Sequence, residues 1–161
     1  MKAVLVVAFM AVPAFALKPP LPLPAACGPQ NVFFSVKLDK SQHTSAHPEP
    51  GKATVYLIAP HFGMGTLTER IGMDGAWVGA NKSTSWINGS WFSISVVPGE
   101  HHVCAQIQPT SDRLMDNPVE LAHFNAEAGK VYYFLGLDLT DSDEAKYLIA
   151  SFHLSISHPK K

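Results

Sequence analysis

Three dipeptides that favour tight turns, Asp74-Gly75, Asn88-Gly89 and Pro98-Gly99, punctuate the middle of the chain. Asp-Gly and Asn-Gly accept the positive φ angles of a two-residue hairpin turn, and Pro-Gly suits the two corners of a type II turn. No catalytic constellation lies between them. We therefore expect this region to form antiparallel strands joined by tight turns.

Apolar residues recur at every second position on both sides of these turns, as expected for strands with one buried face. The clearest case is residues 92–96, where Phe92, Ile94 and Val96 alternate with serines. Similar runs occur at 32–38, 53–58, 103–107, 131–137 and 152–156. Two polar, proline-bearing stretches, 39–51 and 109–118, are predicted loops.

A single helix is predicted near the C-terminus. Asp141 is a suitable N-cap, and Glu144 three residues later resembles the second half of a capping box. Apolar residues then follow at helical spacing, at positions 145, 148, 149 and 152. Together these patterns predict an all-β fold, an antiparallel β-sandwich of about seven strands with one short C-terminal helix.

The N-terminus carries the pattern of an export signal. Residues 1–16 contain a lysine, an apolar run and the small-residue motif Ala14-Phe15-Ala16, which predicts a cleaved signal peptide. The run is shorter than the roughly 20 residues that a membrane-spanning helix needs, and no second one follows. Residues 17–29 form a proline-rich arm, and residues 30–158 are predicted to form one domain. We expect a periplasmic or extracellular protein without a transmembrane segment.

The charge of the chain argues against some partners. The formal net charge is −1, and the predicted signal peptide removes only Lys2, which leaves −2. Without a basic surface, nucleic acids and anionic membrane surfaces are poor partners.

The two cysteines, Cys27 and Cys104, are predicted to form a disulfide, because both follow the signal peptide and an exported protein folds under oxidising conditions. The alternative is a lipid anchor on Cys27, since residues 23–27 faintly resemble a lipobox. However, Pro24 occupies the position where leucine is expected, and Lys18 and four prolines separate Cys27 from the apolar run. The disulfide is therefore the favoured interpretation.

Residues with catalytic or metal-binding potential do not form a known pattern. His101 and His102 are neighbours on a predicted strand and point to opposite faces, whereas His102 and Cys104 share a face that would suit zinc if the thiol were free. Four acidic residues between 138 and 144 lack the spacing of a calcium loop. Neither a Gly-x-Ser-x-Gly elbow nor a reactive Cys-x-x-Cys motif is present. We expect no enzymatic activity, no metal and no cofactor.

Two tryptophans are the best candidates for a ligand surface. If Asn88-Gly89 forms a two-residue turn, Trp86 lies opposite Trp91 in the hairpin, where side chains approach closely. Ordinary hairpin packing is the favoured explanation. The alternative is an exposed aromatic platform for a carbohydrate, formed by Trp86 and Trp91.

Several of the turn and strand motifs resemble a bacterial exported family known as domain of unknown function 2846, and more distantly the PEGA-type surface β-modules. The similar segments are residues 51–56, 74–79, 90–92, 98–101 and 128–133. The resemblance implies a small exported β-sandwich and no catalytic residues. The leading hypothesis is a non-enzymatic envelope or secreted module that interacts with another envelope protein or has a structural role, and the alternative is a carbohydrate-binding module that recognises a glycan.

Overall fold

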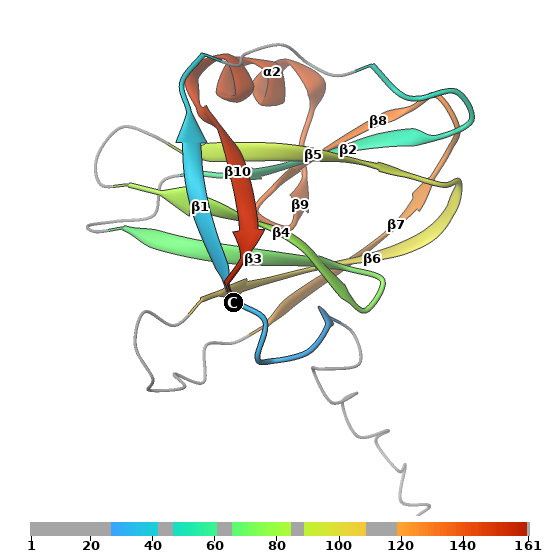
Figure 1. Ribbon diagram of the computed structural model, residues 1–161. Helices are drawn as coiled ribbons and strands as arrows, with labels where there is room; N and C mark the ends of the chain where they lie inside the picture. The colour runs from blue at the N-terminus through green and yellow to red at the C-terminus, as the bar shows by residue number, and fades with distance from the viewer. Residues whose placement is uncertain (1–26, 42–46, 61–65, 85–88, 109–118, 161) are drawn as a thin grey trace, which may run out of the picture.

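The computed structural model describes residues 27–41, 47–60, 66–84, 89–108 and 119–160. Sheet A has six strands, in the spatial order β1 (Phe34–Asp39), β10 (His153–Pro159), β5 (Ser90–Val96), β2 (Ala53–Ala59), β8 (Val131–Leu135) and β9 (Asp138–Leu139). Sheet B has four, in the order β4 (Ala76–Ser83), β3 (Leu67–Met73), β6 (Gly99–Ile107) and β7 (Glu120–Ala126). One helix, α2 (Ser142–Ser151), lies over sheet A (Figure 1).

This architecture confirms the predicted β-sandwich with a C-terminal helix. The described residues contain ten strands rather than about seven, because 67–73, 76–83, 120–126 and 138–139 form strands in addition to the six alternating runs. Neighbouring strands are antiparallel except for the pairs β10–β5 and β2–β8, which are parallel. The predicted signal peptide and most of the proline-rich arm lie outside the described residues.

The main core lies between the two sheets, and the alternating pattern of the strands supplies it. Large side chains from sheet A meet those of sheet B here, chiefly Leu57, Phe92, Phe134, Ile71 and Phe124. Residues at alternate positions share a face of the sheet, so each strand contributes every second side chain to this layer.

A second apolar layer lies between sheet A and α2. Tyr56, Trp91 and Tyr133 project from the outer face of the sheet and pack against Ala145 and Ile149 of the helix. Asp141 caps the helix as predicted, because its carboxylate accepts hydrogen bonds from the backbone N–H groups of residues 143 and 144, at 2.9 and 3.0 Å. Strand β2 is consequently buried on both faces.

Two of the three predicted turns have the expected backbone. Asp74 and Gly75, with φ angles of 51° and 83°, connect β3 to β4 in a tight hairpin, as predicted. Gly99 has the predicted positive φ, 136°, but its turn carries the chain from sheet A to sheet B rather than forming a hairpin.

The predicted hairpin at Asn88-Gly89 is wrong. Asn88 lies outside the described residues, Gly89 does not have a positive φ, and the flanking strands β4 and β5 belong to different sheets. Glycine is needed at position 89 for another reason: a Cβ there would clash with the ring of Phe152 and lie 2.5 Å from the carbonyl oxygen of Ala59. Close packing between distant segments, not turn geometry, explains this glycine.

Candidate functional site

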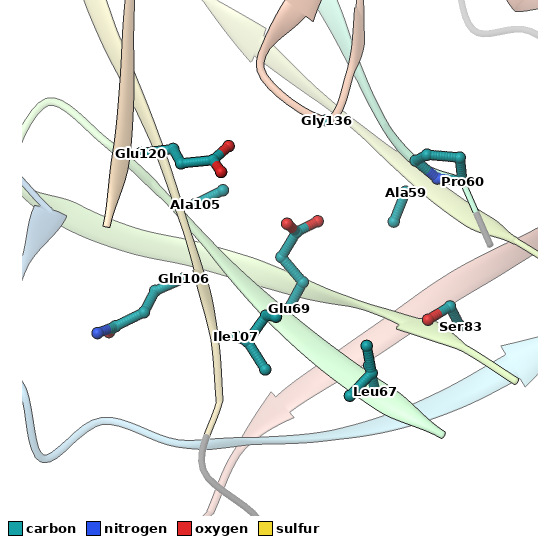
Figure 2. A pocket seen from close by; sticks show the side chains of 10 residues that line it. All are labelled: Ala59, Pro60, Leu67, Glu69, Ser83, Ala105, Gln106, Ile107, Glu120 and Gly136. Carbon is teal, nitrogen blue, oxygen red and sulfur yellow. The ribbon is translucent and has the colours of Figure 1, made fainter. Parts of the chain in front are cut away.

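A pocket of about 230 Å³ opens between the two sheets at one end of the sandwich (Figure 2). Its walls are the ends of strands from both sheets and the turn between β8 and β9. Among the described residues its lining is mainly apolar and comprises Ala59, Pro60, Leu67, Glu69, Ser83, Ala105, Gln106, Ile107, Glu120 and Gly136.

The space exists because small residues occupy inward positions at this end of the sandwich. Ala59 ends β2, Ala105 lies near the end of β6, and Gly136 occupies the β8–β9 turn. Elsewhere between the sheets the corresponding space is filled by phenylalanine, leucine and isoleucine side chains. Protein interiors are normally packed without voids of this size. The pocket therefore follows from the small side chains at these positions.

Two carboxylates face into this apolar pocket. Glu69 on β3 is paired with Ile107 of β6, and Glu120 on β7 is paired with Ala105 of the same strand. Both glutamates therefore lie on the inner face of sheet B, on either side of β6, and both side chains point into the pocket (Figure 2). Glu69 is partly buried, whereas Glu120 is exposed.

The surroundings of Glu69 favour its neutral form. Burial is the main reason, and the negative charge of Glu120 adds to it; together they raise the pKa of Glu69 from 4.5 to about 7. Within the described residues, neither carboxylate makes a hydrogen bond or ion pair. Glu69 thus changes charge in the physiological pH range, because its burial in this mainly apolar lining disfavours the ionised form.

The third polar side chain near the pocket is directed elsewhere. Gln106 lies on the outer face of sheet B, where its side-chain oxygen accepts hydrogen bonds from the guanidinium of Arg70, one of them 3.0 Å from Nε. Figure 2 shows its side chain pointing away from the two glutamates. Apart from the carboxylates, only Ser83 offers a side-chain polar group among the described residues of the lining.

The described lining combines two carboxylates with mainly apolar walls. A pair of carboxylates with different pKa values is the arrangement that glycosidases use. A sugar, however, needs many hydrogen-bonding groups to hold its hydroxyls, and this lining is apolar around the two carboxylates. A ligand pocket of this kind, apolar with a few polar groups, is the usual form of a small-molecule site.

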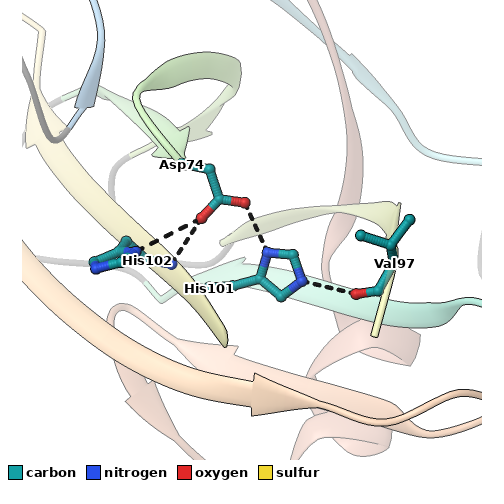
Figure 3. A network of polar contacts seen from close by, with 4 residues as sticks. All are labelled: Asp74, Val97, His101 and His102. Atoms are coloured by element: carbon teal, nitrogen blue, oxygen red, sulfur yellow. Dashed lines mark hydrogen bonds and ion pairs between the residues drawn. The ribbon is translucent and has the colours of Figure 1, made fainter. Parts of the chain in front are cut away.

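A second polar network lies at the opposite end of β6 (Figure 3). The carboxylate of Asp74 is 2.7 Å from Nδ1 of His101 and also accepts the backbone N–H of His102 at 2.9 Å. Nε2 of His101 is 2.7 Å from the carbonyl oxygen of Val97. Both ring nitrogens of His101 therefore face acceptors, and only the protonated ring has two N–H groups to donate.

The pKa values of this pair move in opposite directions. Burial acts against the charged form of His101, but the hydrogen bonds to Asp74 and Val97 and the charge of Asp74 outweigh it and raise the pKa of His101. Burial likewise acts against the charged form of Asp74, but the hydrogen bonds from His102 and His101 and their charge outweigh it and lower the pKa of Asp74. This ion pair fixes the β3–β4 turn against β6.

The structure contains the predicted disulfide between Cys27 and Cys104, which joins residues 77 positions apart. Both cysteines are buried against the outer face of sheet B. Gly72 of β3 makes room for the bond, since a Cβ there would lie 2.6 Å from the carbonyl oxygen of Cys27 and 2.8 Å from the sulfur of Cys104. Because the thiol of Cys104 is oxidised, the thiolate–imidazole site considered for His102 and Cys104 does not form.

The end of the proline-rich arm continues across the same face. The guanidinium of Arg70 stacks 4.2 Å from the ring of Trp77 and donates to the carbonyl oxygens of Gln30 and Val32, at 3.0 and 2.7 Å. Trp77 in turn donates from Nε1 to the carbonyl oxygen of Pro29 at 2.7 Å. The chain that follows Cys27 is thus part of the folded domain.

The structure contradicts the alternative interpretation of Trp91 as part of an exposed aromatic platform. Only 3% of its surface is accessible, because α2 covers this face of sheet A and Nε1 of Trp91 donates to the carbonyl oxygen of Ile149 at 3.2 Å. Its partners across the strands are Ile58 and Leu154, so Trp86 is not its hairpin neighbour. Trp86 itself lies outside the described residues. Trp91 stabilises the helix–sheet layer and is not available as a carbohydrate platform.

Sequence reasoning did not identify Glu69 and Glu120 as site residues. The nearest available signal was the alternation in 120–126, where Glu120 takes the place of an apolar residue in the inward series that continues with Ala122 and Phe124. A glutamate at a core position of a strand is uncommon unless it is paired.

Comparisons with known proteins do not assign the chain to a family. No family model matches it, and neither a curated protein nor a solved structure is significantly similar to it. The resemblance to the exported bacterial family therefore stays a prediction. Across the described ranges, no helix has the length and apolar character needed to cross a membrane, and no group of three or more histidine, cysteine or acidic side chains is arranged to hold a metal ion.

Proposed function

We propose that this protein is a non-enzymatic, exported interaction module, and that its interaction site is the pocket between the sheets. The observation that carries the proposal is the ionisable Glu69, which lies with Glu120 in an otherwise apolar pocket. A carboxyl group in such a place lowers the stability of the fold when it ionises. Natural proteins place such groups mainly at functional sites.

Two further features support a binding role. The pocket is formed by strand ends from both sheets and is therefore held by the paired strands rather than by one loop. The buried cysteine pair is also consistent with a protein that folds after export, because disulfides persist in oxidising compartments. Among the described residues that line the pocket there is no serine–histidine or cysteine–histidine pair.

The proposal is tested with a compact neutral aromatic compound, 2-phenylethanol, whose binding to the mature protein is followed by NMR. Ala105→Leu fills the pocket with a larger side chain, and Ala128→Leu makes the same change in the exposed β7–β8 turn. We expect binding to the wild-type protein and to Ala128→Leu but not to Ala105→Leu. Equal binding to all three proteins would contradict the proposal, as would the absence of binding to the wild type by this compound and by its amine and carboxylate analogues, 2-phenylethylamine and 3-phenylpropionate.

A further inference from the structure

The charges of the pocket specify a class of ligand. Glu69 and Glu120 are the only ionisable residues in the described lining, and no described cation neutralises them. Two carboxylates that face one apolar pocket repel each other, and a cation placed between them removes this repulsion and offsets the unfavourable burial of Glu69. We propose that the ligand is a small organic cation, an ammonium group on a compact apolar body; this inference rests on the pocket being the binding site proposed above.

The size and lining of the pocket define the apolar body. An engineered cavity of about 150 Å³ accepts benzene, so a pocket of about 230 Å³ accommodates one aromatic ring with a short chain. Leu67, Ala59 and Ile107 offer an apolar wall for the ring, while the two carboxylates accept hydrogen bonds from the ammonium group. Hydrogen bonds between charged groups are stronger than neutral ones, which gives a cation an advantage over a neutral compound of the same shape.

Binding of a cation is coupled to the ionisation of Glu69. The groups that face Glu69 from β2, β4, β6 and the β8–β9 turn do not titrate, and Glu120 on β7 is the single ionisable neighbour in the described lining. Glu69 is largely protonated below its pKa of about 7 and must release this proton to pair with an ammonium ion. The affinity for an amine is therefore expected to rise with pH up to about 8, whereas the affinity for a neutral compound is not.

The experiment compares three compounds of similar shape: 2-phenylethylamine, 2-phenylethanol and 3-phenylpropionate. Their affinities are measured by NMR titration at about pH 5 and about pH 8, where the amine stays protonated because alkylamines have pKa values near 10. The proteins are the wild type, Glu69→Gln and Glu127→Gln. The last variant removes the same charge from the exposed β7–β8 turn, at the far end of β7 from the pocket.

At about pH 8, we expect the amine to bind the wild type at least about tenfold more tightly than the alcohol does. This advantage should shrink at about pH 5, disappear in Glu69→Gln and persist in Glu127→Gln. If Glu69→Gln does not fold, as judged by circular dichroism, Glu120→Gln serves instead and should reduce the advantage. Binding of the alcohol or the propionate as tight as that of the amine would overturn the cation inference while leaving the pocket as a site. Absence of binding by all three would overturn the proposed function as well.

Discussion

The pKa of Glu69 yields a specific prediction about stability. A carboxyl group that holds its proton more tightly in the folded protein makes folding less favourable as the pH rises between the two pKa values. For Glu69 these values are 4.5 and about 7, so the loss of stability falls in this interval. Each tenfold change in an ionisation constant corresponds to about 1.4 kcal/mol, which makes the loss about 3 kcal/mol.

The perturbation is Glu69→Gln, which keeps the shape of the side chain but cannot ionise. Relative to the wild type, the variant should gain about 3 kcal/mol of unfolding free energy between about pH 4 and about pH 8. Urea denaturation of both mature proteins across this range measures the difference. Titrating groups that do not interact with Glu69 contribute equally to both proteins, so the difference reports on Glu69 and its repulsion with Glu120.

Glu127→Gln is the matched control, since Glu127 is exposed at the other end of β7. Its stability relative to the wild type should change little with pH. The reasoning is refuted if the wild type and Glu69→Gln give parallel curves. It is equally refuted if the wild type becomes the more stable protein as the pH rises.

The remaining predictions concern the rest of the fold. Gly89→Ala should lower the free energy of unfolding more than Gly99→Ala, because a Cβ at position 89 would clash with atoms of Phe152 and Ala59. A Cβ at position 99 meets open space and costs only backbone strain of about 1 kcal/mol. Equal losses of stability in urea denaturation would disprove this. Cys104→Ser should cost about 4 kcal/mol through the lost disulfide, and an intact mass showing two free thiols or a lipid adduct in the wild type would refute the pairing. Asp74→Asn should destabilise the protein only at pH values between the lowered pKa of Asp74 and the raised pKa of His101, because one of the two residues is neutral outside that window. A loss of stability that is independent of pH would contradict the ion pair. N-terminal sequencing should show that the mature protein begins at Leu17. A sequence that starts with the initiator methionine would rule out cleavage of the predicted signal peptide.

The Asn88-Gly89 segment illustrates where local signals misled. The dipeptide is typical of a hairpin turn, yet the strand that follows pairs with β2 and β10 in the other sheet. Turn propensity acts over four residues and amounts to a small free energy, whereas burial of Phe92 and Trp91 on both faces of β5 involves many contacts. Burial therefore outweighed turn propensity and decided which strands pair.

The alternative interpretation, an exposed Trp91, was wrong for a related reason. Alternation assigned Trp91 correctly to the face opposite Phe92, but it does not say what covers that face. The helix signal at Asp141 was also correct, and the sequence offers no local sign that this helix packs on β5. Both local inferences were correct, but neither reveals that α2 covers Trp91, because this contact joins segments that are distant in the sequence.

The sequence by itself determined the features that depend on residues close in sequence, and the pairing of the two cysteines. Period-two alternation indicated most of the strands, Asp141 indicated the helix start, and two cysteines behind a predicted export signal indicated the disulfide. Only the tertiary structure decided which strands share a sheet and that Glu69 and Glu120 face one pocket. Those two glutamates are far apart in sequence, and their proximity depends on the pairing of β3, β6 and β7, which is set by burial across the whole domain rather than by any local preference.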